Sequence, residues 1–373
     1  MRDIPLTVGE PAPWFIGRTR SNPRYAFDTV GGLYVVLCFF GSAADPVAAA
    51  VLGGIMSSRA RFDEVNTCFF GVSVDPEDER AGRVTDAVPG IRHFWDFDRS
   101  VSARYGASRA DGGYRPITYV LDPGLRVLEV LSISGDPASH VATLLRILDR
   151  LPVLAPSYPA QAQAPVLVLP RVFEPGLCGA LVDHYKARGG VDSGFMHELD
   201  GKTVHAVDYQ HKRRRDCEID DEALRRACMV RIHDRLAPAL HQAFQFRAAL
   251  LERYIVACYD ATEGGYFRPH RDNTTKGTAH RRFAVSLFLN SGEYEGGLLR
   301  FPEFGPALYG APVGGAVVFS CSLLHEATPV ERGCRYMFLP FLYDAAAHRM
   351  REQNLKFVAA ADSSGATRPA ASG

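Results

Sequence analysis

The sequence predicts two domains: an α/β domain, followed by a domain in which helices pack on an antiparallel β core. The length of 373 residues favours two domains, because a single domain usually holds roughly 100–200 residues. A segment without charge that is rich in proline, alanine and glutamine, residues 152–164, is typical of a linker. Before this segment the hydrophobic pattern alternates between strands and helices, whereas after it helices are followed by closely spaced strands.

The first region, residues 1–151, is expected to form an α/β sheet with helices on its faces. Residues 32–40 are an apolar run that begins at a glycine, which is typical of a strand buried on both faces. The expected elements are, in order, this strand, a helix over 46–56, a strand over 67–74, a short helix over 98–105, a hairpin of 116–121 and 125–131, and an amphipathic helix over 138–151.

The second region, residues 165–350, is expected to begin with helices over 174–188 and 220–245, where apolar residues recur at helical spacing. Short apolar strands separated by glycine, proline and asparagine then indicate a sandwich or barrel; they cover 252–259, 282–289, 298–301, 315–319 and 335–343. The C-terminal tail, residues 351–373, ends in small and polar residues, and we expect it to be disordered at its end.

The composition limits the possible partners. Lys and Arg number 42, as do Asp and Glu, and this zero formal charge argues against a protein built to bind nucleic acid. No secretory signal and no apolar stretch of the roughly 20 residues that a membrane span needs is found, so we expect a cytoplasmic protein without a membrane partner. The eight cysteines form no CxxC pair, which favours buried, reduced thiols.

Two histidines and one carboxylate suggest a metal site. His270 and Asp272 lie two residues apart, and side chains at this spacing in an extended segment project to the same side. His-x-Asp alone is a weak signal, but His325 after a later strand would complete a 2-His-1-carboxylate triad. That set suits Fe(II) and leaves coordination positions open, although zinc could use the same atoms.

Arg335 lies ten residues after His325 and starts an otherwise apolar run. Its guanidinium would match the distal carboxylate of a dicarboxylate cosubstrate whose other end chelates the metal. The alternative is an arginine at a strand end that faces solvent.

The segment 251–344 resembles the catalytic core of the prolyl 4-hydroxylase-like Fe(II)/2-oxoglutarate dioxygenases. The matching motifs, in the family's order and spacing, are Val256-Ala-Cys-Tyr259, Gly264-Gly-Tyr-Phe-Arg-Pro-His270-Arg-Asp272, Val285-Ser-Leu-Phe-Leu-Asn290, Gly296-Gly-Leu-Leu-Arg-Phe-Pro302, Gly314-Gly-Ala-Val-Val-Phe319 and His325-x9-Arg335. The resemblance implies a double-stranded β-helix, or jelly roll, in the second domain.

The resemblance also implies the roles of individual residues. His270, Asp272 and His325 would be the iron ligands and catalytic residues, and Arg335 would bind the distal carboxylate of 2-oxoglutarate. Tyr259 matches a family tyrosine that contacts the same cosubstrate; a purely structural role for it in the core remains an equal alternative.

The implied activity is hydroxylation of a C–H bond with Fe(II), 2-oxoglutarate and O2, with ascorbate as a reductant. The expected substrate is a prolyl or other residue of a protein or peptide. Two alternatives stay open: the same chemistry on a free amino acid or natural product, and a noncatalytic two-domain binding protein. The sequence does not predict the oligomeric state.

Residues 5–150 resemble a peroxiredoxin of thioredoxin fold, through Phe70-Gly-Val-Ser-Val-Asp75 and Arg115-Pro-Ile-Thr-Tyr-Val-Leu-Asp122 among other stretches. The position of the family's nucleophilic cysteine is Ala48, and a thiol peroxidase needs a thiolate. We therefore expect a catalytically inactive scaffold or docking module. The competing interpretation is a relocated redox thiol at Cys68.

The run His211-Lys-Arg-Arg-Arg-Asp216 is strongly basic. It could bind an acidic or peptide substrate near the mouth of the active site. We expect it instead to be a solvated loop whose cations pair with the acidic residues that follow it closely.

Overall fold

The computed structural model describes residues 4–159 and 162–359, and the chain divides into two compact units, residues 1–158 and 159–373. The predicted linker, 152–164, contains this division, and its described residues form neither helix nor strand. The predicted domain boundaries stay predictions. The expected disorder at the end of the tail falls on residues 360–373, which lie outside the described residues.

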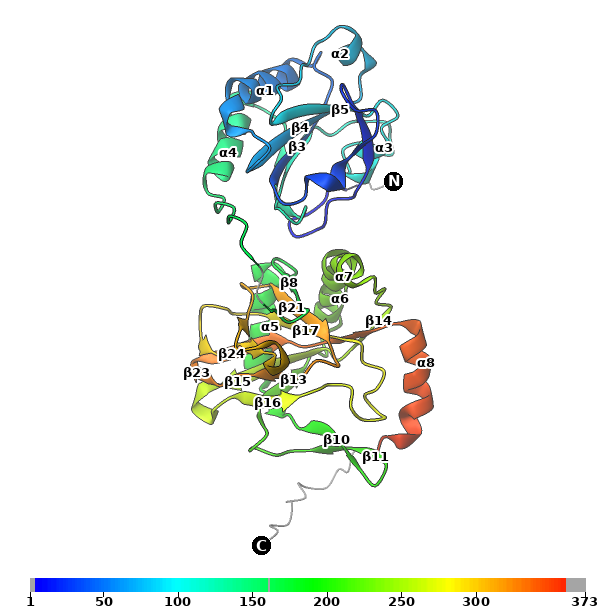
Figure 1. Cartoon of the computed structure of the whole chain (residues 1–373), viewed down its shortest axis with the longest axis vertical. Helices are drawn as coiled ribbons and strands as arrows, with labels where there is room; N and C mark the ends of the chain where they lie inside the picture. Colours follow the sequence, from blue (N-terminus) through cyan, green and yellow to red (C-terminus); the bar gives the residue numbers. More distant parts are fainter. Residues whose placement is uncertain (1–3, 160–161, 360–373) are drawn as a thin grey trace. The chain divides into compact units, whose positions relative to one another are not determined.

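The first unit is a twisted α/β sheet (Figure 1). Its seven strands, counted over residues 4–159, have the order β2-β1-β5-β4-β3-β6-β7. β3 runs parallel to β4, β4 runs parallel to β5, and β6 and β7 are antiparallel additions. Its elements are β1 (Ile16–Thr19), β2 (Tyr25–Ala26), β3 (Tyr34–Gly41), α1 (Pro46–Ser57), β4 (Thr67–Ser73), α2 (Pro76–Arg80), β5 (Ile91–Trp95), α3 (Ser100–Arg104), β6 (Ile117–Leu121), β7 (Val127–Ser132) and α4 (Pro137–Asp149).

Both faces of this sheet are buried, which explains the unbroken apolar run of β3. Alternate side chains of a strand point to opposite faces. Val35, Leu37 and Phe39 belong to one core cluster, and the residues between them belong to another, which α1 and α4 cover. This is the α/β thioredoxin-like fold expected from the sequence. The predicted pattern missed β1, β2, β5 and α2.

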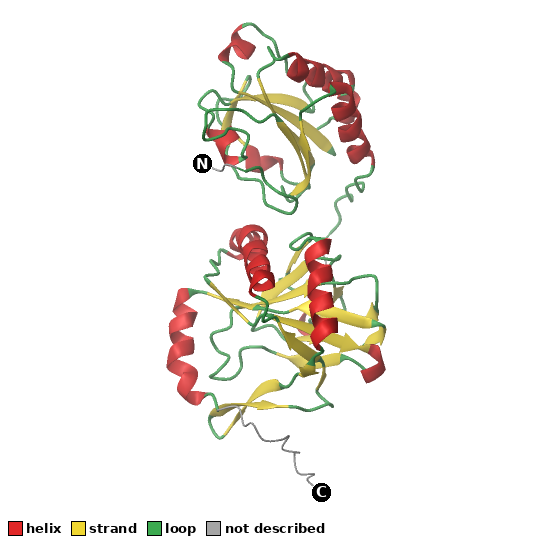
Figure 2. Ribbon diagram, turned by 180° about the vertical axis from the view of Figure 1, so that it is seen from behind, coloured by secondary structure: helices red, strands yellow, loops and turns green. Residues whose placement is uncertain are grey.

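The second unit consists of two antiparallel sheets that face each other, with helices on the outside (Figure 2). Over residues 162–359 the larger sheet has nine strands. Seven of them have the order β14-β25-β17-β24-β15-β13-β9, β21 pairs with β17, and β8 pairs with β21. The smaller sheet has five strands in the order β12-β16-β22-β19-β20. Two facing sheets of this kind form the predicted jelly roll.

The elements of the larger sheet are β8 (Leu167–Leu169), β9 (Val191–Asp192), β13 (Arg215–Glu218), β14 (Leu250–Glu252), β15 (Ile255–Asp260), β17 (Phe283–Phe288), β21 (Ala316–Ser320), β24 (Cys334–Phe338) and β25 (Phe341–Tyr343). Those of the smaller sheet are β12 (Lys212–Arg213), β16 (Tyr266–His270), β19 (Leu299–Arg300), β20 (Leu308–Tyr309) and β22 (His325–Ala327). Two short pairs lie apart from both sheets: β10 (Phe195–Leu199) with β11 (Lys202–Ala206), and β18 (Glu295–Gly296) with β23 (Val330–Arg332).

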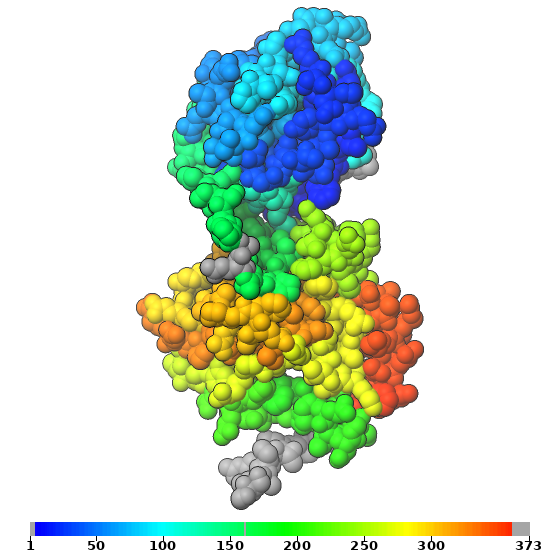
Figure 3. Space-filling view, in the orientation of Figure 1, coloured from blue at the N-terminus to red at the C-terminus, as the bar shows by residue number. Residues whose placement is uncertain are grey.

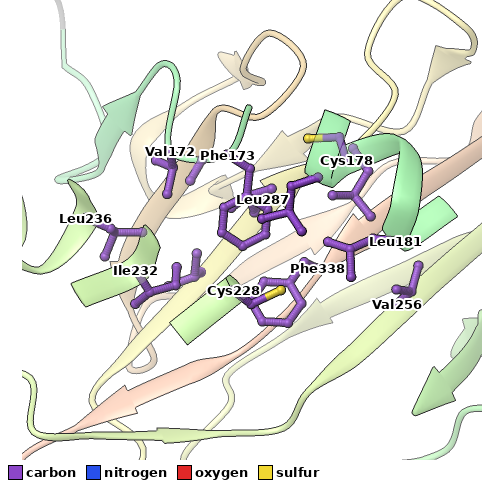
Figure 4. Close-up of a cluster of buried hydrophobic side chains, with 14 of the residues drawn as sticks. Val172, Phe173, Cys178, Leu181, Cys228, Ile232, Leu236, Val256, Leu287 and Phe338 are labelled. Carbon is purple, nitrogen blue, oxygen red and sulfur yellow. The ribbon is translucent and has the colours of Figure 1, made fainter. Parts of the chain in front are cut away.

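Helices α5 (Pro175–Arg188), α6 (Glu222–Arg231) and α7 (Ala237–Phe244) bury the outer face of the larger sheet. Figure 4 shows Leu181 of α5 and Cys228 of α6 over Val256 and Phe338 of the sheet. Because side chains alternate along a strand, the neighbours of these sheet residues point the other way. Ala257, Tyr259 and Met337 accordingly belong to the cluster between the two sheets, where the interior of the jelly roll begins.

Three predicted elements of this unit differ from the observed ones. The strand expected over 252–259 is interrupted at Arg253, whose φ of 71° is left-handed. The strand expected over 335–343 breaks between β24 and β25, where Pro340 lacks the N–H that a ladder needs. The region also begins with a strand, β8, and not with a helix.

The helix predicted over 220–245 contains one wider turn, Ile232–Leu236, between α6 and α7. Pro238 in the first turn of α7 has no N–H to donate, which accounts for the local change of the hydrogen-bond ladder. Within the described residues, the helices are too short or too polar to span a bilayer.

The described part of the tail is folded. Helix α8 (Ala345–Asn354) lies along the surface beside the segment that follows β16 (Figure 3), where Asn354 donates a hydrogen bond to the carbonyl of Lys276 at 2.8 Å. The N–H of Ala359 donates to the carbonyl of Thr203 in β11 at 3.0 Å. Ala359, the last described residue, therefore connects the tail to the β10–β11 hairpin, which sequence patterning did not predict.

Candidate functional site

The three predicted metal ligands lie together inside the jelly roll. His270 ends β16 and His325 begins β22, and the pairing of these two strands puts the histidines directly opposite each other. Nε2 of His270 is 3.5 Å from Oδ1 of Asp272, and Nε2 of His325 is 3.4 Å from Oδ2 of the same carboxylate. The three potential ligand atoms all lie within 4.8 Å of one another, close enough to share one ion.

Hydrogen bonds to the backbone orient both imidazoles. Nδ1 of His270 lies 2.8 Å from the carbonyl of Arg268, and Nδ1 of His325 lies 3.0 Å from that of Leu323. A carbonyl only accepts hydrogen bonds, so each Nδ1 carries the proton, and the lone pair of each Nε2 is free to bind a cation beside the carboxylate of Asp272. The three donors therefore fit a divalent metal ion and would leave coordination positions open for other ligands, as non-haem Fe(II) requires.

The electrostatics of the triad favour the protonation states that a metal needs. Burial, and then the charge of His270, lowers the pKa of His325 to about 4, so its imidazole is neutral at neutral pH. Burial by itself would raise the pKa of Asp272, but the two histidines and Arg281 outweigh it and hold that pKa below its usual value. A neutral imidazole and an ionised carboxylate are the forms that bind metal.

Arg335 points into the same interior, where it is 1% exposed. It lies opposite Tyr259 in the pairing of β24 with β15, and its guanidinium carbon is 4.9 Å from the centre of that ring and 5.3 Å from that of Phe288. Its Nε has no hydrogen-bond partner, and no described residue forms an ion pair with it. A buried cation is costly unless it is paired, so this guanidinium suits an anion from outside the protein, such as the distal carboxylate of 2-oxoglutarate.

The glycine pair before β19 makes room for this arginine. Gly297 has a φ of +61°, and a Cβ on it would lie 2.8 Å from Cδ of Arg335. A side chain at position 297 would therefore displace the guanidinium.

Tyr259 is buried and accepts a 3.5 Å hydrogen bond from Nη1 of Arg214. Its hydroxyl and ring line the same cavity as the triad and Arg335. Both interpretations made from the sequence, a core residue and a contact of the cosubstrate, are compatible with this position.

The cavity has a volume of about 450 Å³ and opens between the two sheets and the β10–β11 hairpin. This volume lies within the range of roughly 300–1,000 Å³ that is common for ligand pockets. Its lining includes Lys212 and Arg214, which are 4% and 8% exposed. The prediction of a solvated loop over 211–216 is wrong for these two cations: Lys212 lies in β12, which pairs with β16, and Arg214 lies between β12 and β13, which pairs with β15, and both side chains are buried.

In the first unit, Ala48 occupies the position predicted for the peroxidatic cysteine. It lies at the start of α1, where Oδ1 of Asp45 accepts hydrogen bonds from the N–H groups of Val47 and Ala48 at 2.8 and 2.9 Å. All eight cysteines of the chain lie in the described residues, and burial is the first cause that raises the pKa of each of them. Cys68, the proposed relocated thiol, is 2% exposed and has a pKa raised to about 12, which leaves no thiolate for peroxide chemistry at neutral pH.

Comparison with known proteins identifies both parts of the chain. Residues 254–343 match the family model of the 2OG-Fe(II) oxygenase superfamily, and residues 8–130 match that of the AhpC/TSA family. Two curated relatives, the PKHD-type hydroxylases of Synechococcus sp. strains JA-2-3B'a(2-13) and JA-3-3Ab, are each 29% identical over 116 residues, which is 28% of this chain and 51% of theirs. The chain thus spans about half the length of the curated relatives it matches.

Solved structures resemble each part separately. A prolyl-4-hydroxylase of Pseudomonas putida has a TM-score of 0.37 at 20% identity and covers 49% of this chain and 94% of its own. A prolyl hydroxylase of Trichoplax adhaerens, solved with a hypoxia inducible factor peptide, has a TM-score of 0.37 at 16% identity, covering 51% and 87%. The peroxidoxin BcpB of Mycobacterium tuberculosis has a TM-score of 0.35 at 22% identity, covering 39% and 99%. Residues 254–343 of this chain thus match the 2OG-Fe(II) oxygenase superfamily, and residues 8–130 match the AhpC/TSA family, each over less than half of the chain.

Proposed function

We propose that this protein is an Fe(II)- and 2-oxoglutarate-dependent hydroxylase that acts on a prolyl or other residue of a protein or peptide. One observation carries the proposal: a single cavity contains both an open 2-His-1-carboxylate triad and, at Arg335, a buried guanidinium that has no ion partner among the described residues. Neither feature has a structural use that would explain it, since both are costly to bury without a ligand.

The chain's own groups have defined tasks in this reaction. His270, Asp272 and His325 would hold the metal ion at the end of β16 and the start of β22, where they line the cavity. Arg335 orients the cosubstrate by its distal carboxylate. Fe(II), 2-oxoglutarate and O2, when bound, supply the oxidising chemistry: one oxygen atom enters the substrate C–H bond as hydroxyl and the other enters succinate, with release of CO2.

The residues around the triad exclude water from it. Phe267 stacks on the ring of His270 with 3.5 Å between the ring centres, and the ring of Phe319 lies 4.6 Å from that of His325. Both phenylalanines are buried, as is Leu299 in the same lining. A dry surrounding strengthens the electrostatic contacts inside the cavity and protects a reactive oxidant from solvent.

The names of the related hydroxylases support a peptide or protein substrate. They indicate no partner for the first unit. We propose that this unit, with Ala48 in place of a nucleophile, serves as a scaffold or docking module. Ascorbate as a reductant is part of the proposal. The cytoplasmic location stays a prediction.

The decisive experiment is to measure succinate formed from 2-oxoglutarate by the full chain with Fe(II) and O2. The wild type should form succinate even without its substrate, at a slow uncoupled rate, whereas His270→Ala should fall to the rate of the protein-free control. His233→Ala is the matched control, because that imidazole is 84% exposed on the helical side of the unit and should not alter the rate. A wild type as inactive as His270→Ala would refute the hydroxylase proposal.

A further inference from the structure

The cavity contains a second group of cations besides Arg335. Lys212, Arg214 and Arg253 all line it, and we call them the basic cluster. Asp216 pairs with two of them: it accepts two hydrogen bonds from Arg214, at 2.7 and 2.6 Å, and lies 3.6 Å from Nη2 of Arg253. Among the described residues, the three cations thus have one carboxylate at ion-pair distance, which leaves a positive surplus in a confined space.

Lys212 is the member of the cluster with the least compensation. Its Nζ is buried and donates to Oγ of Ser193 at 2.8 Å and to the carbonyl of Gly194 at 2.5 Å, and it lies 4.8 Å from the centre of the Phe267 ring. An ammonium has three N–H groups, so one remains, and no described carboxylate forms an ion pair with it. Burial, and then Arg214, lowers the pKa of Lys212 well below its usual value, which reflects the cost of a cation at this place.

The basic cluster is separate from Arg335 but close to it. The ring of Tyr259 lies between them: the guanidinium carbon of Arg335 is 4.9 Å from its centre, and that of Arg214 is 5.8 Å away. Phe267 contacts both Lys212 of the cluster and His270 of the triad. The cavity therefore offers two anion sites: one is Arg335, and the other is the basic cluster, which is near Arg335 through Tyr259 and near the triad through Phe267.

We propose that the molecule oxidised in this cavity carries a carboxylate, and that the basic cluster binds it. This inference rests on the proposed function and names the class of its substrate. Arg335 would receive the carboxylate of the cosubstrate, and the cluster that of the substrate. One N–H of Lys212 and the guanidinium of Arg253, which has only a 3.6 Å ion pair with Asp216 among the described residues, can meet the two oxygens of a carboxylate.

The carboxylate could belong to a free amino acid, to the C-terminus of a peptide, or to an acidic side chain within one. The chemistry at the basic cluster is the same in each case. A set of probes separates these sources: N-acetylated amino acids, peptides with a free C-terminus, and C-terminally amidated peptides with one internal glutamate, each paired with the same compound in amide form.

Binding can be measured without turnover. The full chain is loaded with Zn(II), which can use the same three ligands and is diamagnetic, and with 2-oxoglutarate. Saturation-transfer NMR then compares each acid with its amide. At least one acid should bind, and its amide should bind about 10-fold or more weakly, the equivalent of about 1.4 kcal/mol for a lost charge-assisted contact.

Variants locate the effect. Lys212→Met should weaken the acid about 10-fold, and it should change neither the binding of the amide nor that of 2-oxoglutarate. Lys212 also binds Ser193 and Gly194, so its removal could disturb the local structure, and Arg253→Asn is therefore the second variant. Asparagine tolerates the left-handed backbone of this position. Arg253→Asn should show the same selective loss of affinity for the acid. Lys186→Met, at an exposed site on α5, is the control.

The outcomes separate this inference from the proposed function. If the wild type binds neither Zn(II) nor 2-oxoglutarate, the proposed function is wrong, and this inference falls with it. If it binds both but prefers no acid to its amide, or if Lys212→Met and Arg253→Asn leave the acid affinity unchanged, only the carboxylate inference is wrong. A loss of 2-oxoglutarate affinity in Lys212→Met as large as that in Arg335→Met would also overturn it, since the cluster would then serve the cosubstrate.

Discussion

Replacing Arg335 by methionine tests whether this side chain binds the cosubstrate. The side chain is 1% exposed and is enclosed by the rings of Tyr259 and Phe288. A carboxylate bound there would be removed from water, and truncating one member of such a pair costs roughly 2–5 kcal/mol. A central value of about 3 kcal/mol corresponds to a dissociation constant of 2-oxoglutarate raised about 150-fold.

Calorimetric titration of 2-oxoglutarate into the Zn(II)-loaded protein measures this change. The affinity for the metal itself should stay the same, because the three ligands are untouched. Arg335→Lys should fall between wild type and Arg335→Met, since a lysine keeps the charge but loses the planar fork. Arg332→Met, three residues away on an arginine that is 75% exposed, is the matched control and should bind like wild type.

The same variant should not lose stability in the absence of ligands. In the free protein no described residue pairs with this guanidinium, so its removal leaves no carboxylate uncompensated. Thermal unfolding of metal-free Arg335→Met should therefore occur at or above the wild-type temperature. Unchanged affinity for 2-oxoglutarate, or a large loss of stability with unchanged affinity, would show that Arg335 is a structural cation and would refute its assigned role.

Two further predictions concern acid stability and thiol chemistry. Burial would raise the pKa of Glu252, but hydrogen bonds from His280 and Arg281 lower it from 4.5 to about 2. The ionised carboxylate therefore stabilises the folded protein fully above the pKa of the unfolded state, and this contribution is lost as the pH falls toward about 2. Urea unfolding should show that the free energy of unfolding falls by on the order of 3 kcal/mol between pH 5 and 2, and Glu252→Gln should lack this loss. An equal loss in both proteins would contradict this. Peroxide consumption should stay at the buffer rate in the wild type and in Cys68→Ser, because the pKa of the Cys68 thiol is raised to about 12. If the wild type consumed peroxide at a measurable rate and Cys68→Ser did not, the first unit would be an active peroxidase.

The sequence by itself determined the features that depend on near neighbours. The apolar run of β3 and the helical spacing of α5 predict their structures, because both patterns arise from side-chain periodicity along one segment. His270 and Asp272 were recognisable for the same reason, because side chains two residues apart in an extended segment project to the same side, although the observed strand ends at His270 and Asp272 lies in the turn after it. The motif spacing from 251 to 344 placed these residues in a family and thereby also indicated His325 and Arg335.

The tertiary structure decided which faces became interior. Arg335 starts an otherwise apolar run and Lys212 lies in a basic run, and neither pattern says which side of the segment will meet another sheet. The pairing of β24 with β15 turns Arg335 inward beside Tyr259, and the pairing of β12 with β16 does the same for Lys212.

This is why the basic run 211–216 was predicted to be solvated. Charges in a short stretch are usually exposed, and their burial becomes possible only when residues distant in sequence supply partners. Here Ser193 and Gly194 provide acceptors for Lys212, from a part of the chain about twenty residues earlier. Local periodicity is encoded in a segment, whereas the side of it that is removed from water depends on which other segments pack against it.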